Sequence, residues 1–150
     1  MRALIQRVTE ASVSIEGLSE RSIGKGIVVL LGITGTDSEK EVTWLIEKIL
    51  TLRIFPSDDR TSEFDRSVED VGGEILVVSQ FTLYGNVRKG RRPDFSDAAG
   101  TADARKLYDR FVELLTQRFP RVTTGEFQAT MLVKIHNQGP VTLLLDTPTP

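Results

Sequence analysis

Residues 27–53 read IVVLLGITGTDSEKEVTWLIEKILTLR, and this stretch contains both kinds of secondary structure on which the fold depends. The short apolar run of residues 27–33 is bounded by glycines and predicts a buried strand. Residues 38–53 predict a helix, opened by a capping box of Ser38 and Glu41. Its apolar residues recur at the helical spacing of 3.6, at Val42, Leu45, Ile46, Ile49 and Leu50.

Further strands are predicted on both sides of this stretch. Alternating apolar residues or short apolar runs indicate strands at residues 4–8, 13–15, 52–55, 74–83, 122–127, 129–136 and 141–146. A second amphipathic helix is predicted from about Ala102 to Phe119, with Pro120 past its end. Residues 57–73 and 85–100 are expected to be loops, and residues 147–150 a frayed tail.

The order of elements indicates the fold class. Two helices among roughly seven strands cannot cover both faces of a large parallel sheet, which favours a mixed α+β architecture. The length fits a single domain spanning residues 1–150. Strand-rich surface needs a cover, and a second copy of the chain can supply one, so we expect a homodimer.

Composition excludes several classes of protein. The chain has no cysteine and one histidine, His136, so disulfide scaffolds, thiolate zinc sites and cysteine nucleophiles are ruled out. A net charge of −2 confines any nucleic-acid contact to a local patch. The longest apolar run is far shorter than a bilayer span, and Arg2, Arg7 and Glu10 interrupt any signal peptide. We therefore expect a cytoplasmic protein with no membrane partner.

Several familiar motifs are incomplete. Gly24-Lys-Gly26 precedes a strand instead of joining a strand to a helix, which argues against dinucleotide binding. Residues 85–90 have the glycine spacing of a phosphate-binding loop, but Arg91-Arg92 stands where Lys-Ser/Thr is required. Acidic pairs lie in polar loops without further ligands, so no metal and no cofactor are predicted. His136 is either a general base or, as we favour, a solvated strand-end residue, because no Gly-x-Ser-x-Gly elbow accompanies it.

Two short segments carry the functional signal. Ser79-Gln-Phe-Thr-Leu-Tyr-Gly85 places two hydroxyls and an amide directly after a buried strand. Asn137-Gln-Gly-Pro-Val-Thr142 places Gly-Pro between two predicted strands. Taken singly, the first is consistent with a strand end and the second with a hairpin turn.

Together the two segments resemble the signature segments of the D-aminoacyl-tRNA deacylase family. The opening residues 1–15, the segment 23–33 and the loop Lys89-Gly-Arg-Arg-Pro-Asp-Phe95 are similar to the family as well, in the expected order. The resemblance covers nearly the whole chain. It implies a three-layer β/β/α fold and a cytoplasmic homodimer that removes D-amino acids, and also glycine, from tRNA as translation quality control.

The resemblance also implies roles for individual residues. Ser79, Gln80, Phe81 and Thr82 would line the catalytic pocket for the terminal adenosine and the ester. Gly139-Pro140 would be joined by a cis peptide bond and inserted into the partner's active site, where it selects chirality. The remaining substrate-binding positions are Asn137, Phe127 and Met131. Gln138 and Gln128 depart from the pattern, where Asp and Gly are common, which bears on fine tuning such as the handling of glycine.

The residues themselves favour a mechanism without a strong base. An aminoacyl ester is already activated, so positioning and oxyanion stabilisation by N–H groups near Gln80, Phe81 and Thr82 suffice. No base is available to activate Thr82, and the resemblance points to the 2′-hydroxyl of the tRNA. The basic run Arg88, Lys89, Arg91 and Arg92 is either a solvated face or a tRNA phosphate contact. The alternatives to an enzyme are a non-catalytic RNA-end or nucleotide-binding module and a small dimeric metabolite-binding domain.

Overall fold

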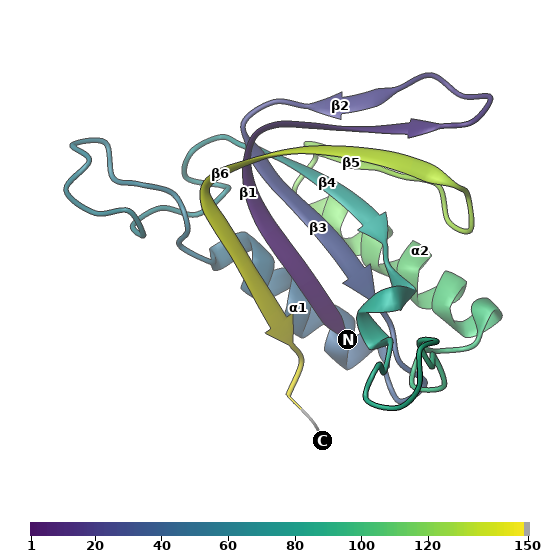
Figure 1. Ribbon diagram of the computed structural model, residues 1–150. Helices are drawn as coiled ribbons and strands as arrows, with labels where there is room; N and C mark the ends of the chain where they lie inside the picture. Colours follow the sequence, from purple (N-terminus) through teal and green to yellow (C-terminus); the bar gives the residue numbers. More distant parts are fainter. Residues whose placement is uncertain (149–150) are drawn as a thin grey trace.

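The computed structural model describes residues 1–148 as one mixed sheet of six strands with two helices on one side (Figure 1). The strands are β1 (Arg2–Ile15), β2 (Arg21–Ile23), β3 (Gly26–Gly32), β4 (Glu74–Ser79), β5 (Val122–Thr124) and β6 (Met131–Asp146). The helices are α1 (Glu39–Thr51), α2 (Thr101–Arg118) and the short 3₁₀ helix η1 (Phe81–Tyr84).

The sheet combines parallel and antiparallel pairing. Its order is β2-β1-β3-β4-β5, with β6 paired to β1. The β3–β4 and β4–β5 pairs are parallel, and α1 and α2 form the crossovers between them. β1 pairs antiparallel with β2, β3 and β6. The mixed α+β class predicted from the order of elements is confirmed.

Both helices cover the same face of the sheet. The predicted capping box is present at α1, where the Ser38 N–H donates to Glu41 Oε2 at 2.8 Å. The five periodic apolar residues of α1 are all buried, and α2 contributes Tyr108, Phe111 and Leu115 to the same core. Within residues 1–148, no helix is both long enough and apolar enough to cross a bilayer.

A second apolar cluster lies on the opposite face of the sheet. Val28 and Leu76 alternate with the helix-facing residues of β3 and β4, and they pack against Val8, Val13 and Ile15 from the distal half of β1. The sheet thus curves over itself, and the distal part of β1 with β2 forms an outer layer above β3 and β4 (Figure 1). This is the three-layer β/β/α arrangement that the resemblance implied.

The structure corrects several predicted boundaries. Residues 52–55 form no strand, because their pairing is limited to a single bridge between Phe55 and Arg66. β4 ends at Ser79, since the chain then turns into η1. Thr147 is not frayed: its N–H donates to the carbonyl of Met1 at 2.9 Å. The last two residues of the predicted tail, 149–150, lie outside the described residues.

Gly139-Pro140 does not form the hairpin turn with which its composition is consistent. Residues 131–146 form one strand, β6, that runs alongside β1 for its whole length. Between the pairs Gln6–Thr142 and Val8–Asn137, β6 has more residues than β1, so residues 138–141 bulge out of the ladder. The proline lacks an N–H and the glycine has φ +118°, so neither fits a regular ladder position.

Candidate functional site

The first predicted motif forms the end of β4 and the turn of η1. The Gln80 N–H donates to the carbonyl of Leu31 at 2.7 Å, which fixes the motif to the end of β3. A Cβ on Gly32 would lie 3.2 Å from the Gln80 carbonyl and from Tyr84 Cδ2. The turn therefore rests directly on the backbone of β3, and this close approach favours a glycine at position 32.

A cavity of about 460 Å³ opens beside this turn. It brings together Ser79, Gln80 and Phe81 with two other predicted site residues, Phe127 and Met131. Its remaining lining residues come from the ends of β3 and β4, the start of β6, the 125–130 turn, the start of α2 and the loops next to β3 and α2: Leu31, Ile33, Val78, Ala99, Thr101, Ala104, Gln128, Ala129 and Val133. Thr82 does not line it. The Thr82 hydroxyl accepts a hydrogen bond from the side-chain amide of Gln80, which does line the cavity.

Two arginines hold the wall that carries Phe127. Arg21 donates to the carbonyls of Thr124 and Gly125 at 2.8 and 3.2 Å. Arg105 donates to the Phe127 carbonyl at 3.4 Å, with its guanidinium carbon 4.7 Å from the centre of the Phe127 ring. These contacts fix the backbone of the turn, so the ring has a defined place at the cavity.

The wall ends in a tight turn before β6. A Cβ on Gly125 would lie 2.6 Å from Met131 Sδ, so the thioether occupies the space that a side chain would need. Gln128 has φ +64°, in the left-handed region that only a few per cent of non-glycine residues adopt. The departure of Gln128 from the family pattern therefore coincides with a backbone conformation that favours glycine.

The second predicted motif lies at a different hollow. Gly139 and Pro140 are exposed in the bulge of β6, and the peptide bond between them is cis. The Asn137 side chain spans the bulge: its Nδ2 donates to Thr142 Oγ1 at 2.8 Å and its Oδ1 accepts from the Val141 N–H at 3.3 Å. The bulge is thus closed by side-chain hydrogen bonds in place of ladder pairing.

Beneath the bulge lies a buried arginine. The Arg7 side chain is 4% exposed, and it donates to the carbonyls of Ile54 and Gln138 at 2.8 and 3.3 Å. It also pairs with Glu63 at 3.4 Å. A Cβ on Gly139 would lie 3.0 Å from Arg7 Nη2, so the guanidinium packs directly under the glycine.

The two motifs do not meet within one chain. Among residues 1–148, no side chain lines both the cavity beside η1 and the hollow at Gly139-Pro140. Met131 and Gly139 both belong to β6, and the strand between them covers about 25 Å of contour at ~3.3 Å per residue. One chain therefore presents the two predicted halves of the site at separate places.

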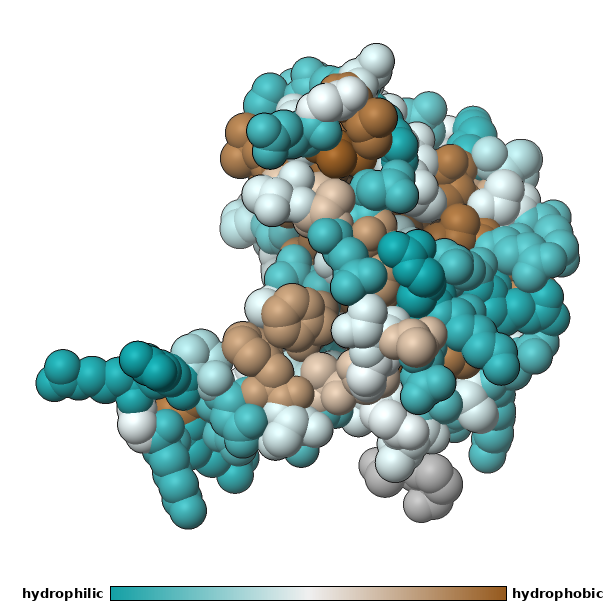
Figure 2. Space-filling model, turned by 90° about the vertical axis from the view of Figure 1, so that its right-hand side faces the viewer, coloured by the Kyte–Doolittle hydropathy of each residue, from teal (hydrophilic) through white to brown (hydrophobic). Residues whose placement is uncertain are grey.

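The predicted basic run lies in the loop that follows η1. Asn86 and Asp94 close this loop with two backbone hydrogen bonds of 2.7 and 2.9 Å. The exposed cations Arg88, Lys89, Arg91 and Arg92 lie within it. Phe95 at its base packs edge-on against Phe81, with ring centres 5.0 Å apart. Figure 2 shows the loop as a hydrophilic arm that projects below a hollow with apolar residues in its walls.

The neighbourhood of the cavity is poor in groups that titrate near neutral pH. Burial raises the pKa of Tyr84, at the end of η1, to about 12, so its hydroxyl stays protonated. Burial likewise raises the pKa of Tyr108, beside Phe127, to about 12. His136 lines neither hollow, and its Nδ1 lies 3.1 Å from Glu10 Oε1 on the exposed surface.

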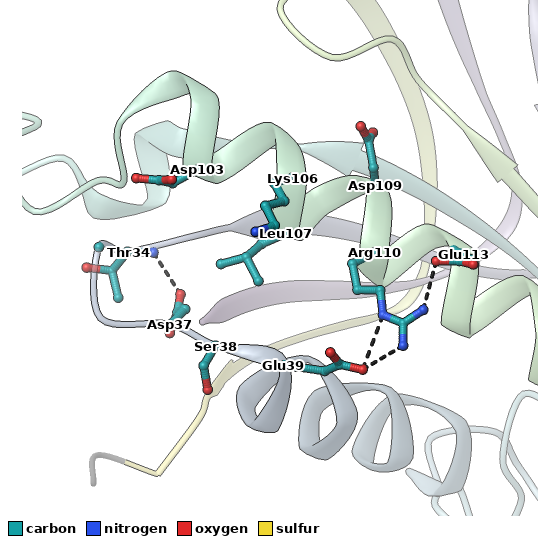
Figure 3. A pocket seen from close by; sticks show the side chains of 11 residues that line it. Thr34, Asp37, Ser38, Glu39, Asp103, Lys106, Leu107, Asp109, Arg110 and Glu113 are labelled. Atoms are coloured by element: carbon teal, nitrogen blue, oxygen red, sulfur yellow. Dashed lines mark hydrogen bonds and ion pairs between the residues drawn. The ribbon is translucent and has the colours of Figure 1, made fainter.

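A larger groove, of about 900 Å³, lies between the start of α1 and the side of α2 (Figure 3). Some of its charged groups pair with each other: Arg110 contacts Glu39 at 2.6 Å and Glu113 at 2.8 Å. Asp37 accepts from the Thr34 N–H at 2.8 Å and also pairs with the amino group of Met1. The groove includes no predicted site residue. Its ion pair between Arg110 and Glu39 joins α2 to α1.

Sequence reasoning missed several residues at the site. Thr101 and Ala104 line the cavity from the first turns of α2, where the sequence predicted a helix but gave no reason to place it at the site. Arg7 and Arg21 contact site segments through main-chain carbonyls, which are invisible in a side-chain motif. The one available signal was Arg7 itself, a charged residue among the apolar positions of a predicted strand.

Comparisons with known proteins place this geometry in a family. A family model described as D-Tyr-tRNA(Tyr) deacylase matches residues 4–146. A D-aminoacyl-tRNA deacylase of Myxococcus xanthus is 51% identical over 150 residues, covering 100% of this chain and 97% of the relative. A D-aminoacyl-tRNA deacylase of Clostridium botulinum is 50% identical over 147 residues, covering 98% of this chain and 97% of the relative.

Solved structures agree with the fold. A structure titled c-Myc DNA Unwinding Element Binding Protein superposes with a TM-score of 0.93 at 44% identity, covering 99% of this chain and 100% of that one. A probable eukaryotic D-amino acid tRNA deacylase superposes with a TM-score of 0.86 at 19% identity, covering 96% and 97%, and shows a shared fold. With a family model spanning nearly all of its length and relatives half identical to it, this chain belongs to the D-Tyr-tRNA(Tyr) deacylase family.

Proposed function

We propose that the chain hydrolyses the ester between a D-amino acid and the 3′ end of tRNA, and that it acts as a cytoplasmic homodimer. Family membership supports the reaction. The single structural observation that carries the proposal is the cavity in which Ser79, Gln80 and Phe81 meet Phe127 and Met131. Two segments far apart in the sequence thereby form one pocket that carries both polar groups and apolar side chains, which suits an aminoacylated nucleoside.

The proposed chemistry uses the backbone of η1. The Gln80 N–H is not available as an oxyanion donor, because it donates to Leu31. Within residues 1–148, the N–H groups of Phe81 and Thr82 make no hydrogen bond, as is usual at the start of a helix. These two N–H groups would stabilise the oxyanion when water attacks the ester carbonyl carbon. The bond to the 3′-oxygen then breaks, which releases a free amino acid and a tRNA with its 3′-hydroxyl.

The proton in this step would be handled by the substrate. The cavity includes no histidine or carboxylate, and within residues 1–148 the one hydrogen-bond partner of the Thr82 hydroxyl is the side-chain amide of Gln80. The 2′-hydroxyl of the terminal ribose is adjacent to the ester and would orient the attacking water. An already activated ester needs positioning more than a strong base, so this arrangement is sufficient.

Chiral selection would come from a second copy of the chain. Gly139 and Pro140 are exposed on a strand with a free outer edge, because β6 pairs only with β1 among the described strands. An unpaired edge with the exposed apolar residues Leu132, Leu143 and Leu144 is suited to a subunit contact. The proposed dimer would bring Gly139-Pro140 of the partner subunit to the cavity, where main-chain atoms reject an L side chain by contact.

The same geometry has consequences for substrates. Glycine has no side chain to be rejected, so glycyl-tRNA would also be a substrate. The arm of residues 86–94 lies directly after η1, so Arg88, Lys89, Arg91 and Arg92 would contact tRNA phosphates near the acceptor end. Selection through main-chain contacts would allow broad acceptance of D side chains together with rejection of L ones.

A direct assay tests the proposal. Purified protein is incubated with D-Tyr-tRNA, L-Tyr-tRNA and Gly-tRNA, and the loss of each ester is followed over time. We expect rapid loss of the D ester, loss of the glycyl ester and no acceleration for the L ester. Equal loss of both tyrosyl esters contradicts chiral selection. Binding of the tRNA without loss of any ester would instead indicate a non-catalytic RNA-end module.

A further inference from the structure

η1 carries half of the proposed site, yet few buried contacts of its own hold this short helix in place. None of its four residues is buried, and Phe81 is 57% exposed. Short 3₁₀ helices have weak internal hydrogen bonds, and the carbonyls at their ends have no partner within the helix. A segment with so few buried contacts opens easily unless something outside it fixes its backbone.

The side chain of Arg2 supplies such an anchor at the far end of η1. Its Nη1 donates to the Leu83 carbonyl at 2.8 Å, and its guanidinium carbon lies 4.9 Å from the centre of the Tyr84 ring. Its Nε donates to Asp146 Oδ1 at 2.7 Å. The Arg2 side chain is 32% exposed, so the guanidinium is partly shielded from water where these contacts meet.

These contacts connect η1 to both long strands. Arg2 and Asp146 are paired residues of β1 and β6, so their ion pair lies across a sheet ladder. The planar guanidinium bonds to this carboxylate and to the Leu83 carbonyl at the same time, which a lysine ammonium on its flexible stem does not reproduce. Tyr84 and Gln80 also rest on the backbone at Gly32, the residue of β3 that pairs with Arg2. η1 is thus held by β3 and by the Arg2 guanidinium.

We infer that Arg2 is a positioning residue of the site: it fixes the end of η1, and with it the positions of the Phe81 and Thr82 N–H groups beside the cavity. This inference rests on the proposed function, because it assigns the oxyanion to those two groups. Arg2 touches neither the cavity nor the substrate, so its effect is transmitted through Leu83 and Tyr84. Loss of Arg2 should therefore lower the rate of the chemical step more than the affinity for tRNA.

The test compares Arg2→Ala and Arg2→Lys with two controls. Arg110→Ala removes a similarly exposed arginine with two ion pairs on the helical face, and Asp146→Asn removes the carboxylate while the Leu83 hydrogen bond remains. Single-turnover deacylation of D-Tyr-tRNA gives the rate of the chemical step and the apparent Kd. Hydrogen exchange by mass spectrometry reports on residues 80–85, and thermal unfolding identifies the folded variants.

For Arg2→Ala we expect the chemical step to slow about 10- to 100-fold with an unchanged Kd, as for a displaced oxyanion donor. Exchange in residues 80–85 should rise. Arg2→Lys should recover only part of the rate, Arg110→Ala should match the wild type, and Asp146→Asn, which keeps the Leu83 hydrogen bond, should slow the step less than Arg2→Ala does. A wild-type rate in folded Arg2→Ala overturns the inference. If Arg2→Ala does not fold, Arg2→Lys decides by the same readouts. If the wild type itself has no activity, the proposed function fails, and the exchange data alone decide whether Arg2 holds η1.

Discussion

The Arg7 guanidinium donates a hydrogen bond to the main-chain carbonyl of Gln138, 3.3 Å away, from beneath the bulge that carries Gly139. The same group binds the carbonyl of Ile54 and the carboxylate of Glu63. One buried cation therefore joins β1, the loop after α1 and the exposed bulge of β6. The orientation of the bulge depends on a residue that no substrate would touch.

Arg7→Ala should destabilise the protein and impair chiral selection. It leaves two main-chain carbonyls without their charged donor, at an expected cost of about 2–4 kcal/mol in the free energy of unfolding. Urea unfolding and the ratio of D-Tyr-tRNA to L-Tyr-tRNA deacylation measure the two effects. Arg118→Ala, which removes an exposed ion pair with Glu47, is the control and should change neither. An unchanged D/L ratio in Arg7→Ala would contradict this role.

Gly139→Ala should impair deacylation more than it impairs folding. A side chain at φ +118° is strained, and its Cβ would lie 3.0 Å from Arg7 Nη2, so we expect a cost of about 1–3 kcal/mol. The displaced bulge should slow loss of the D ester at least about tenfold at saturating enzyme. Gly35→Ala is the matched control, because a Cβ there meets nothing within 4 Å. Equal rates for the two variants would remove Gly139 from the site.

Thr82→Ala should keep substantial activity. The Thr82 hydroxyl contacts the Gln80 amide and has no base beside it, so its removal should leave the rate within about tenfold of wild type. A tRNA ending in 2′-deoxyadenosine should instead lose about 100-fold or more, because it lacks the group that orients water. Complete inactivation of Thr82→Ala with intact tRNA binding would show that the threonine is catalytic.

The arm of residues 86–94 should contribute affinity but not chemistry. Replacing Arg88, Lys89, Arg91 and Arg92 with alanine should raise KM for D-Tyr-tRNA and leave kcat unchanged. The slope of log Kd against log salt should fall by up to about 3, given ~0.7 per phosphate contact with single-stranded RNA. Lys40→Ala, an exposed cation on α1, serves as the control. If the salt dependence of this variant equals that of the wild type, the tRNA phosphates bind outside the arm.

The free energy of unfolding should fall at high pH because two tyrosines, Tyr84 and Tyr108, lose their protons. Burial raises the pKa of Tyr84 and of Tyr108 to about 12, above the ordinary 10.0. The folded state therefore binds the protons of these two hydroxyls more tightly than the unfolded state does. The stability that this supplies below pH 10 is lost as the pH rises towards 12. Unfolding measured from pH 9 to 12 should show this decline, and Tyr84→Phe with Tyr108→Phe should flatten it. An unchanged slope in the double variant would contradict the burial of these hydroxyls.

The parts of the fold that follow from local patterns were predictable from the sequence. α1 begins at its capping box and buries each of its five periodic apolar residues, because both signals are contained within a few residues. The buried run of β4 and the position of α2 were predictable for the same reason. The mixed class then followed from counting elements, since two helices can cover only one face.

The features that depend on distant pairing were not predictable. Gly139-Pro140 reads as a turn by composition, and only the ladder with β1 makes it a bulge within one strand. Phe127 and Ser79 line one cavity because the sheet is curved. From the sequence, only the resemblance to the family predicted that they share a site; the spacing of residues did not. Arg2, Arg7 and Arg21 act on carbonyls, and no sequence pattern reveals which carbonyl an arginine will meet.

β1 and β6 are paired from Arg2 and Asp146 at one end to Ile15 and Met131 at the other, with register shifts between residues 6 and 11 of β1. This two-stranded ribbon belongs to both β layers and ties the outer layer to the inner one. A pocket built on it would be largely preformed. Discrimination between D and L substrates would then depend on whether the substrate fits the existing shape of the pocket as it enters, and not on any later rearrangement of the protein.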